Sequence, residues 1–308
     1  MQTLPLAAGA LWGCEGAAPP TRYRLPRKPL VVVTSTVQAA DMVREIGGEA
    51  VTVTSLIAPL VNPHFWQPKA ADYAQVEMAD VFFLCGLGLE EKYTGDLEAL
   101  RARGLHVGVL ANGLVDEDIL TGKDGRPDPH FWMDPRLWGK AALTVADVLS
   151  AAAPRAALWF SDRAHEYAND LEQLHTFAAK EFGDLPASSR FMFTSHDSMR
   201  YFCAAYLLEA RSVASAAGVA LTQAPEELTR WLGDHAIRIL FRENVTDLKT
   251  IQGIARTLNV VVDPQIFSLS LGLPGTVLTG LGNDLDVSGF LGALRYTMDT
   301  ILGRMVRA

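Results

Sequence analysis

Short apolar runs alternate with stretches of helical period over most of this chain of 308 residues. Leu30–Thr34 is almost wholly apolar, which is typical of a buried strand in a parallel sheet. The next stretch, Val37–Ile46, has the periodicity of an amphipathic helix and ends at Gly47-Gly48. Because this order recurs along the chain, we predict an α/β fold whose strand-end loops form a binding edge.

The same patterns predict the remaining elements. Further strands are expected at Val51–Thr54, Val81–Leu84, Val107–Leu110, Arg190–Thr194, Ile237–Phe241 and Val260–Val262. Further helices are expected at Ala70–Met78, Glu90–Ala102, Met199–Leu207, Pro225–Gly233, Leu248–Leu258 and Ser288–Met305.

One stretch in the middle of the chain departs from the alternation. Leu137–Ala151 reads as one helix, Pro154 ends it, and Ala157–Phe182 reads as a second, much longer helix. A helix of that length between two α/β halves can serve as a rigid spine. We therefore predict two α/β lobes, each a mostly parallel sheet flanked by helices, joined by one long linker helix. The expected divisions are residues 30–153 for the first lobe, 154–183 for the linker helix and 184–308 for the second lobe.

A short histidine motif occurs twice. Asn62–Trp66 and Asp128–Trp132 both contain the word Pro-His-Phe-Trp, and each proline stiffens the turn that carries its histidine. A third histidine, His196, follows an apolar run where a strand should end. One such residue alone is more often an isolated turn histidine. Three at strand ends favour a metal site, since neutral imidazole is the commonest zinc ligand. We predict that His64, His130 and His196 bind a metal ion.

Composition excludes other classes of partner. Hydrophobic residues at 49%, charged residues at 20% and a net charge of −8 describe a globular protein without the basic surface that nucleic acids require. No apolar run approaches the length of a membrane span. Cys85 and Cys203 lie in apolar runs, so we expect them to be buried hydrophobic residues, not disulfide partners or metal ligands.

Residues 1–29 resemble an export segment followed by a tether. The apolar stretch Thr3–Gly13 leads into Leu11-Trp12-Gly13-Cys14, which is similar to a lipoprotein cleavage box, where Cys14 would carry the lipid. Two features depart from that pattern, because no basic residue precedes the stretch and Trp12 is bulky. The alternative is a disordered tail. Glu15–Pro29, with its prolines and basic residues, is typical of an extended tether.

Several words of the sequence together resemble one family, the zinc- and manganese-binding solute receptors of bacterial ABC importers (the ZnuA/TroA-like family). The words, which span nearly all of Leu30 to Gly303, are Val61–His64, Ala79–Val81, Gly86–Glu90, Asp128–Pro135, Thr194–Asp197 and Tyr201-Phe202. The resemblance implies two α/β lobes joined by a long helix, with one metal in the cleft. It also implies that His64 and His130 come from the first lobe and His196 from the second.

The resemblance carries expectations about function. It implies a receptor, not an enzyme, that acts in the periplasm or at the cell surface as a monomer and delivers the ion to an importer permease. Some manganese-binding members have a glutamate where His196 stands. Because three nitrogen ligands suit zinc better than manganese, we expect Zn²⁺, with Mn²⁺ as the less favoured ion.

One position departs from the family. Leu269 stands where the family has an aspartate that completes the site, and leucine cannot bind a metal. Three substitutes stay open for the fourth position: water, a carboxylate such as Asp263 or Glu243, or no ligand. A receptor or adhesin of the same fold that no longer uses zinc is one alternative function. A three-histidine zinc hydrolase is another, although only Asp197 stands near as a base and it more naturally orients a ligand or caps a helix.

Overall fold

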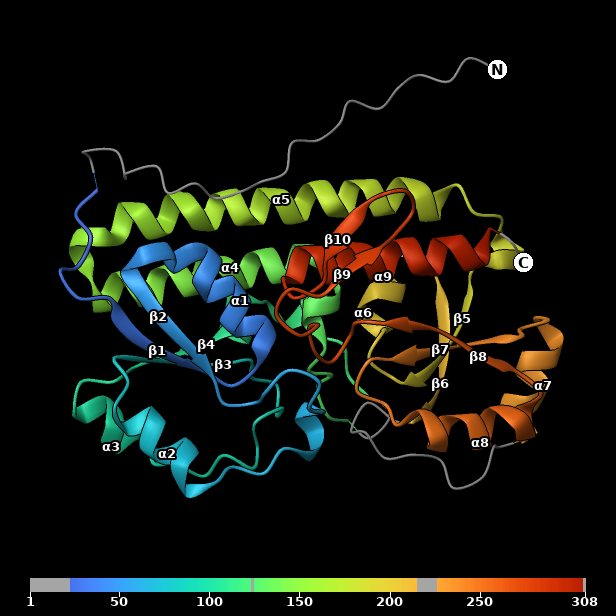
Figure 1. The fold of residues 1–308 in the computed structure, drawn as a ribbon, viewed down its shortest axis with the longest axis horizontal. Coiled ribbons are helices and arrows are strands. Elements are labelled where there is room, and N and C mark those ends of the chain that lie inside the picture. The colour runs from blue at the N-terminus through green and yellow to red at the C-terminus, as the bar shows by residue number, and fades with distance from the viewer. Residues whose placement is uncertain (1–22, 123–124, 215–225, 307–308) are drawn as a thin grey trace, which may run out of the picture.

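The computed structural model describes residues 23–122, 125–214 and 226–306. Two four-stranded parallel sheets lie at opposite ends of the molecule, and one long helix runs past both (Figure 1). The first sheet has the order β2-β1-β3-β4 and the second β6-β5-β7-β8. The predicted α/β class with two parallel sheets and a long helix is therefore confirmed.

The elements of the first half follow the predicted order. Its strands are β1 (Leu30–Thr34), β2 (Val51–Ser55), β3 (Val81–Leu84) and β4 (His106–Val109), and its helices are α1 (Val37–Gly47), α2 (Ala70–Glu77), α3 (Leu97–Ala102) and α4 (Pro135–Ala152). The strand β3 is buried along its whole length, as an apolar run between two helical layers should be. The helix α1 begins where the Thr36 side chain accepts a hydrogen bond from the Ala39 N–H.

The long helix α5 (Ala157–Gly183) leads into the second half. Its strands are β5 (Phe191–His196), β6 (Glu209–Ala214), β7 (Ile239–Glu243) and β8 (Val261–Ile266), followed by the hairpin β9 (Val277–Thr279) and β10 (Asp284–Asp286). Its helices are α6 (Arg200–Tyr206), α7 (Glu226–Asp234), α8 (Leu248–Leu258) and α9 (Phe290–Met305). Pro225, the predicted first residue of α7, lies outside the described residues.

The hydrophobic core is continuous along the long helix α5. One hydrophobic cluster joins buried residues of α1, α4 and α5 to those of α6 and α9. Figure 1 shows α5 beside α4 at one end and beside α9 at the other. Within residues 23–306, Cys85 and Cys203 are free and buried, as predicted. Among the described helices, none combines the length and apolar character of a membrane span.

The structure differs from the local predictions in one helix and in its edge strands. The predicted helix Glu90–Ala102 begins only at Leu97, because the Glu90 carboxylate is turned inward and accepts hydrogen bonds from Ser35 Oγ and from the backbone of Cys85 and Gly86. Asp96 then caps the shortened helix. The sequence does not predict the strand β6, because its residues mix polar and apolar types at a sheet edge and do not form an apolar run, nor does it predict the short hairpin strands β9 and β10.

The helix α9 is capped from the other half of the chain. Its own N-cap residue, Gly289, offers no side chain, and the Phe290 N–H donates instead to Asp41 Oδ2 on α1 at 2.8 Å. Burial, together with Glu45 and Asp286, raises the pKa of Asp41 to about 7, against the lowering effect of the Phe290 N–H and Arg44.

This raised pKa predicts how the stability of the metal-free protein depends on pH. Folded Asp41 holds its proton more tightly than the unfolded chain does, so its contribution is complete below the unfolded pKa of about 3.9 and is lost as pH rises through about 7. Asp41→Asn keeps a hydrogen-bond acceptor but cannot ionise. We therefore expect it to raise the melting temperature most at pH 8, with a gain that shrinks as the pH falls toward about 4. The exposed Asp116→Asn is the control, and equal pH profiles for both variants would contradict the assignment.

Candidate metal centre

His64 is carried by a single 3-10 turn between β2 and α2. Pro63 opens the turn Pro63–Phe65, and Asn62 caps it by accepting a hydrogen bond from the His64 N–H at 3.0 Å. The Lys92 ammonium donates to the His64 carbonyl oxygen at 2.6 Å. The backbone of His64 is thus fixed from both sides, and its imidazole is partly buried.

His130 is held by the residue two positions before it. Asp128 Oδ1 lies 3.0 Å from the His130 backbone nitrogen and 2.6 Å from ring Nδ1, and both side chains are fully buried. Because an ionised carboxylate only accepts hydrogen bonds, Nδ1 carries the ring proton and Nε2 presents its lone pair. The Trp132 ring packs edge-on against the His130 ring, with centroids 5.3 Å apart.

His196 is the last residue of β5. Its ring Nδ1 lies 3.6 Å from Oε1 of Glu243, the last residue of β7, and both side chains are almost wholly buried. The hydroxyls of Ser195 and Ser198 donate to the Glu243 carboxylate and hold it in place. His130 therefore has a hydrogen-bonded carboxylate at Nδ1, the outer partner that metal-bound histidines usually have, and at His196 a buried carboxylate lies close to Nδ1 but beyond hydrogen-bond distance.

The structure brings the three predicted histidines together. One ring nitrogen of each lies within 4.8 Å of the others, and the Nε2 atoms of His64 and His130 are 2.9 Å apart. Ligand nitrogens at 2.0–2.1 Å from a tetrahedral zinc ion lie about 3.3 Å from one another. The three nitrogens thus converge closely enough to hold one ion of this kind.

Protonation favours metal binding at this place. Burial, with smaller contributions from His130, His196 and Lys92, lowers the pKa of His64 to about 2. Burial alone would raise the pKa of Asp128, but hydrogen bonds from His130 and the charge of Arg200 lower it below its usual value. At neutral pH the site thus combines a neutral His64 with an ionised Asp128.

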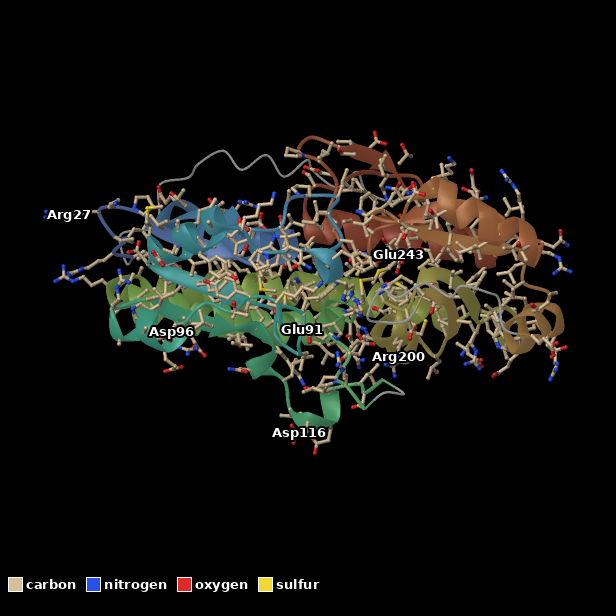
Figure 2. All side chains as sticks on the ribbon, turned by 90° about the horizontal axis from the view of Figure 1, so that it is seen from below. Arg27, Glu91, Asp96, Asp116, Arg200 and Glu243 are labelled. Carbon is tan, nitrogen blue, oxygen red and sulfur yellow. The ribbon has the colours of Figure 1, made fainter. Side chains whose placement is uncertain are left out.

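Contacts from the second half of the chain reach the segment that carries Asp128. The Arg200 guanidinium lies 3.2 Å from Asp128 Oδ2, and the Tyr201 hydroxyl donates to the Asp128 carbonyl oxygen at 2.9 Å. In Figure 2, Arg200 and Glu243 both lie among the elements of the second half, right of the centre of the view. No sequence pattern assigned a role to Arg200 or Tyr201, whereas the short Asp-Pro-His spacing was a visible signal for Asp128.

The fourth-ligand candidates lie elsewhere. Asp263 is half exposed and pairs with Arg304 at 2.5 Å, and it is not part of the histidine group. Glu243 stands at Nδ1 of the His196 ring and is not part of that group either. Leu269 is only 2% exposed and belongs to the hydrophobic core. The alternative cap role of Asp197 is wrong, because Met199 is the N-cap residue of α6 and no side chain caps that helix.

The contact between Asp128 and His130 leads to a testable expectation. Asp128→Asn removes the charge that fixes the His130 tautomer, so we expect zinc binding to weaken about ten- to a hundredfold. Asp118→Asn is a matched control, since Asp118 lies in the same segment but pairs with Lys140 near the surface. Competition with a chelator measures both affinities. Equal affinities for the two variants would remove Asp128 from the site.

Comparison with known proteins agrees with this geometry. Residues 32–302 match the model of the family described as "Zinc-uptake complex component A periplasmic". The chain is 28% identical to the zinc-binding protein TroA of Treponema pallidum, over 98% of this chain and 97% of that one. It is 30% identical to the manganese-binding lipoprotein MntA of Bacillus subtilis, over 90% of this chain and 92% of that one. The solved structure of the periplasmic zinc-binding protein TroA superposes with a TM-score of 0.80 at 25% identity, covering 90% of this chain and 99% of that one. The chain therefore belongs to the family of periplasmic zinc-uptake components.

Proposed function

We propose that this chain is an extracytoplasmic receptor that binds one zinc ion through His64, His130 and His196 and delivers it to an ABC importer. The convergence of the three ring nitrogens within 4.8 Å is the observation that carries this proposal. The names of the relatives agree with it, since they include zinc-binding and manganese-binding proteins and a substrate-binding lipoprotein of a manganese ABC transporter.

The donor atoms support zinc as the ion. All three converging groups are imidazoles, which are borderline ligands that suit zinc, whereas manganese favours carboxylate and water oxygens. The two buried carboxylates nearest the rings, Asp128 and Glu243, interact with histidine Nδ1 atoms and act from the outer shell. We therefore expect zinc to bind more tightly than manganese.

The family is one of solute-binding receptors, which argues against a zinc hydrolase. A hydrolase would also need a base beside the metal-bound water. Within the described part of the chain, Asp128 and Glu243 are already engaged by His130 and by two serine hydroxyls. Neither carboxylate is therefore placed to act on a water molecule.

The remaining parts of the proposal concern placement in the cell and assembly. We propose a periplasmic or surface location, a permease as the partner and a monomeric state. We also propose that the first lobe ends at residue 153 and that the linker helix ends at residue 183. Attachment through a lipid on Cys14 belongs to the same proposal, although Cys14 lies outside the described residues. Relatives described as lipoproteins support such an anchor.

A zinc titration tests the proposed function. Metal-free protein is titrated with zinc in the presence of a competing chelator that reports the free ion. We expect one tight site per chain, with weaker binding of manganese in the same assay. Absence of a site tighter than the chelator background would overturn the proposal.

A further inference from the structure

Three neutral imidazoles do not complete the coordination of a bound zinc ion. They supply three of the four ligands that zinc prefers and none of the negative charge that would balance the ion. Among the described residues, the group of ligand atoms near enough to one another contains only the three histidines. A fourth ligand must therefore come from a side chain that moves, or from solution.

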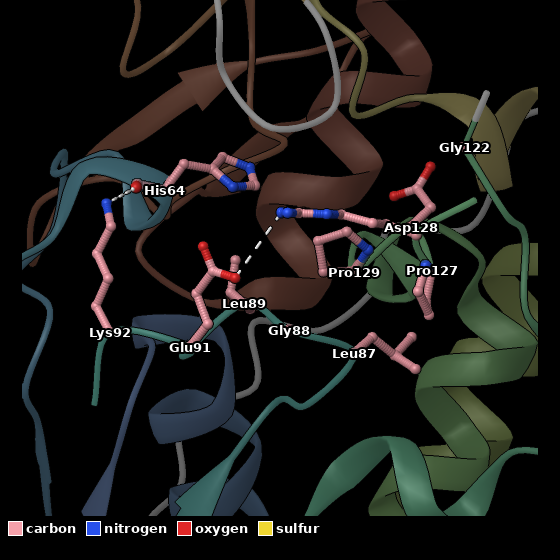
Figure 3. Close-up of a pocket in the computed structure, with 11 residues that line it drawn as sticks. His64, Leu87, Gly88, Leu89, Glu91, Lys92, Gly122, Pro127, Asp128 and Pro129 are labelled. Carbon is pink, nitrogen blue, oxygen red and sulfur yellow. Dashed lines mark hydrogen bonds and ion pairs between the residues drawn. The ribbon is translucent and has the colours of Figure 1, made fainter. Parts of the chain in front are cut away.

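A cavity of about 340 Å³ opens beside His64 and shows where such a side chain could come from. Figure 3 shows the His64 imidazole at one edge of this cavity and Leu87 at the opposite edge. Two carboxylates line the wall, those of Glu91 and Asp128. Of these two lining carboxylates, Asp128 is held by the His130 ring and by Arg200, so Glu91 is the one that can move toward an ion.

Glu91 is held loosely. Its carboxylate oxygen lies 3.9 Å from an Arg126 nitrogen, and the side chains are 62% and 71% exposed, so the pair adds little to stability. In Figure 3 the Glu91 carboxylate points toward the half of the cavity that contains the His64 ring. Its neighbour Lys92 donates to the His64 carbonyl oxygen at 2.6 Å, which ties this part of the chain to the histidine turn.

We propose that Glu91 is the fourth zinc ligand, recruited from the cavity wall when the ion binds. One carboxylate oxygen leaves the Arg126 guanidinium and coordinates zinc in place of a water molecule. This inference rests on the proposed zinc site and adds to it an anionic ligand that no spacing in the sequence indicates. It also supplies the site with an anionic ligand, which the apolar Leu269 cannot provide.

Isosteric substitution tests the proposal. Glu91→Gln keeps the shape of the side chain but removes its charge, so we expect zinc affinity to fall tenfold or more. In the cobalt-substituted protein, the visible absorption of the ion is expected to change, because it reports the ligand set. Glu98→Gln is the matched control, since Glu98 is also an exposed glutamate paired with an arginine, Arg101. We expect it to match the wild type in both measurements.

A second variant separates coordination from a structural ion pair. Arg126→Gln releases Glu91 from its partner, so zinc affinity is expected to rise. If the pair were merely structural, both Glu91→Gln and Arg126→Gln would lower zinc affinity. Unchanged zinc affinity and an unchanged cobalt spectrum in Glu91→Gln would overturn the inference and assign the fourth position to water or a solute anion. Absence of zinc binding by the wild-type chain would instead overturn the proposed function itself.

Discussion

Replacing His130 with alanine is expected to weaken zinc binding more than about a hundredfold, or about 2.7 kcal/mol. His130 is fully buried, its Nδ1 is fixed by Asp128, and its Nε2 lies 2.9 Å from that of His64. Loss of an outer-shell partner alone typically costs ten- to a hundredfold, so loss of a direct ligand should cost at least that much. His64→Ala and His196→Ala should show losses of the same order.

The control for these variants is a histidine with a different environment. His165 is exposed on α5, where its ring contacts the Ser161 carbonyl oxygen of the preceding turn. His165→Ala should bind zinc like the wild type in a chelator competition. If any one of the three site histidines can be replaced without loss of affinity, that residue is not a ligand.

Replacing Leu269 with aspartate is expected to lower the free energy of unfolding by at least about 3 kcal/mol. The side chain is 2% exposed and packs within the main hydrophobic cluster, so the substitution removes apolar contacts and buries a carboxyl group without a partner. Denaturation of the metal-free protein measures the loss. Leu269→Met keeps the volume and should cost less than about 1.5 kcal/mol.

The same variant tests whether position 269 reaches the metal. If it did, an aspartate there would add an anionic ligand and raise zinc affinity about tenfold, or about 1.4 kcal/mol, without loss of apo stability. The observed burial among apolar side chains favours the destabilised outcome. Higher affinity together with unchanged stability would contradict the placement of Leu269 in the core.

The fold was predictable where one physical signal dominated. Apolar runs such as that of β3 indicate strands buried on both faces, and the helical period of α5 persists over 27 residues. The prediction failed where tertiary contacts override local preference. Glu90 favours a helix by itself, but its buried hydrogen bonds to Ser35 and to backbone amides hold the chain in a turn.

The histidines of the candidate site were predictable from the sequence, but the contacts that support them were not. The two Pro-His-Phe-Trp words and the strand-end position of His196 indicated the three residues that the fold brings together. The contacts that hold the histidine-bearing segments in place could not be predicted in this way. Their partners are far apart in sequence, since Ser195 and Glu243 are 48 residues apart and Tyr201 and Asp128 are 73 apart. Such pairs follow from how the two halves pack against each other, and no local spacing indicates them.

Elemental analysis measures most directly whether each chain binds one zinc ion. The chain is expressed in medium with equal concentrations of zinc and manganese, purified without added metal and analysed for both elements, alongside a variant with all three site histidines replaced by alanine. We expect about one zinc per wild-type chain, little manganese, and no zinc in the triple variant. Bound manganese in place of zinc, or an equal zinc content in the triple variant, would contradict a three-histidine zinc receptor.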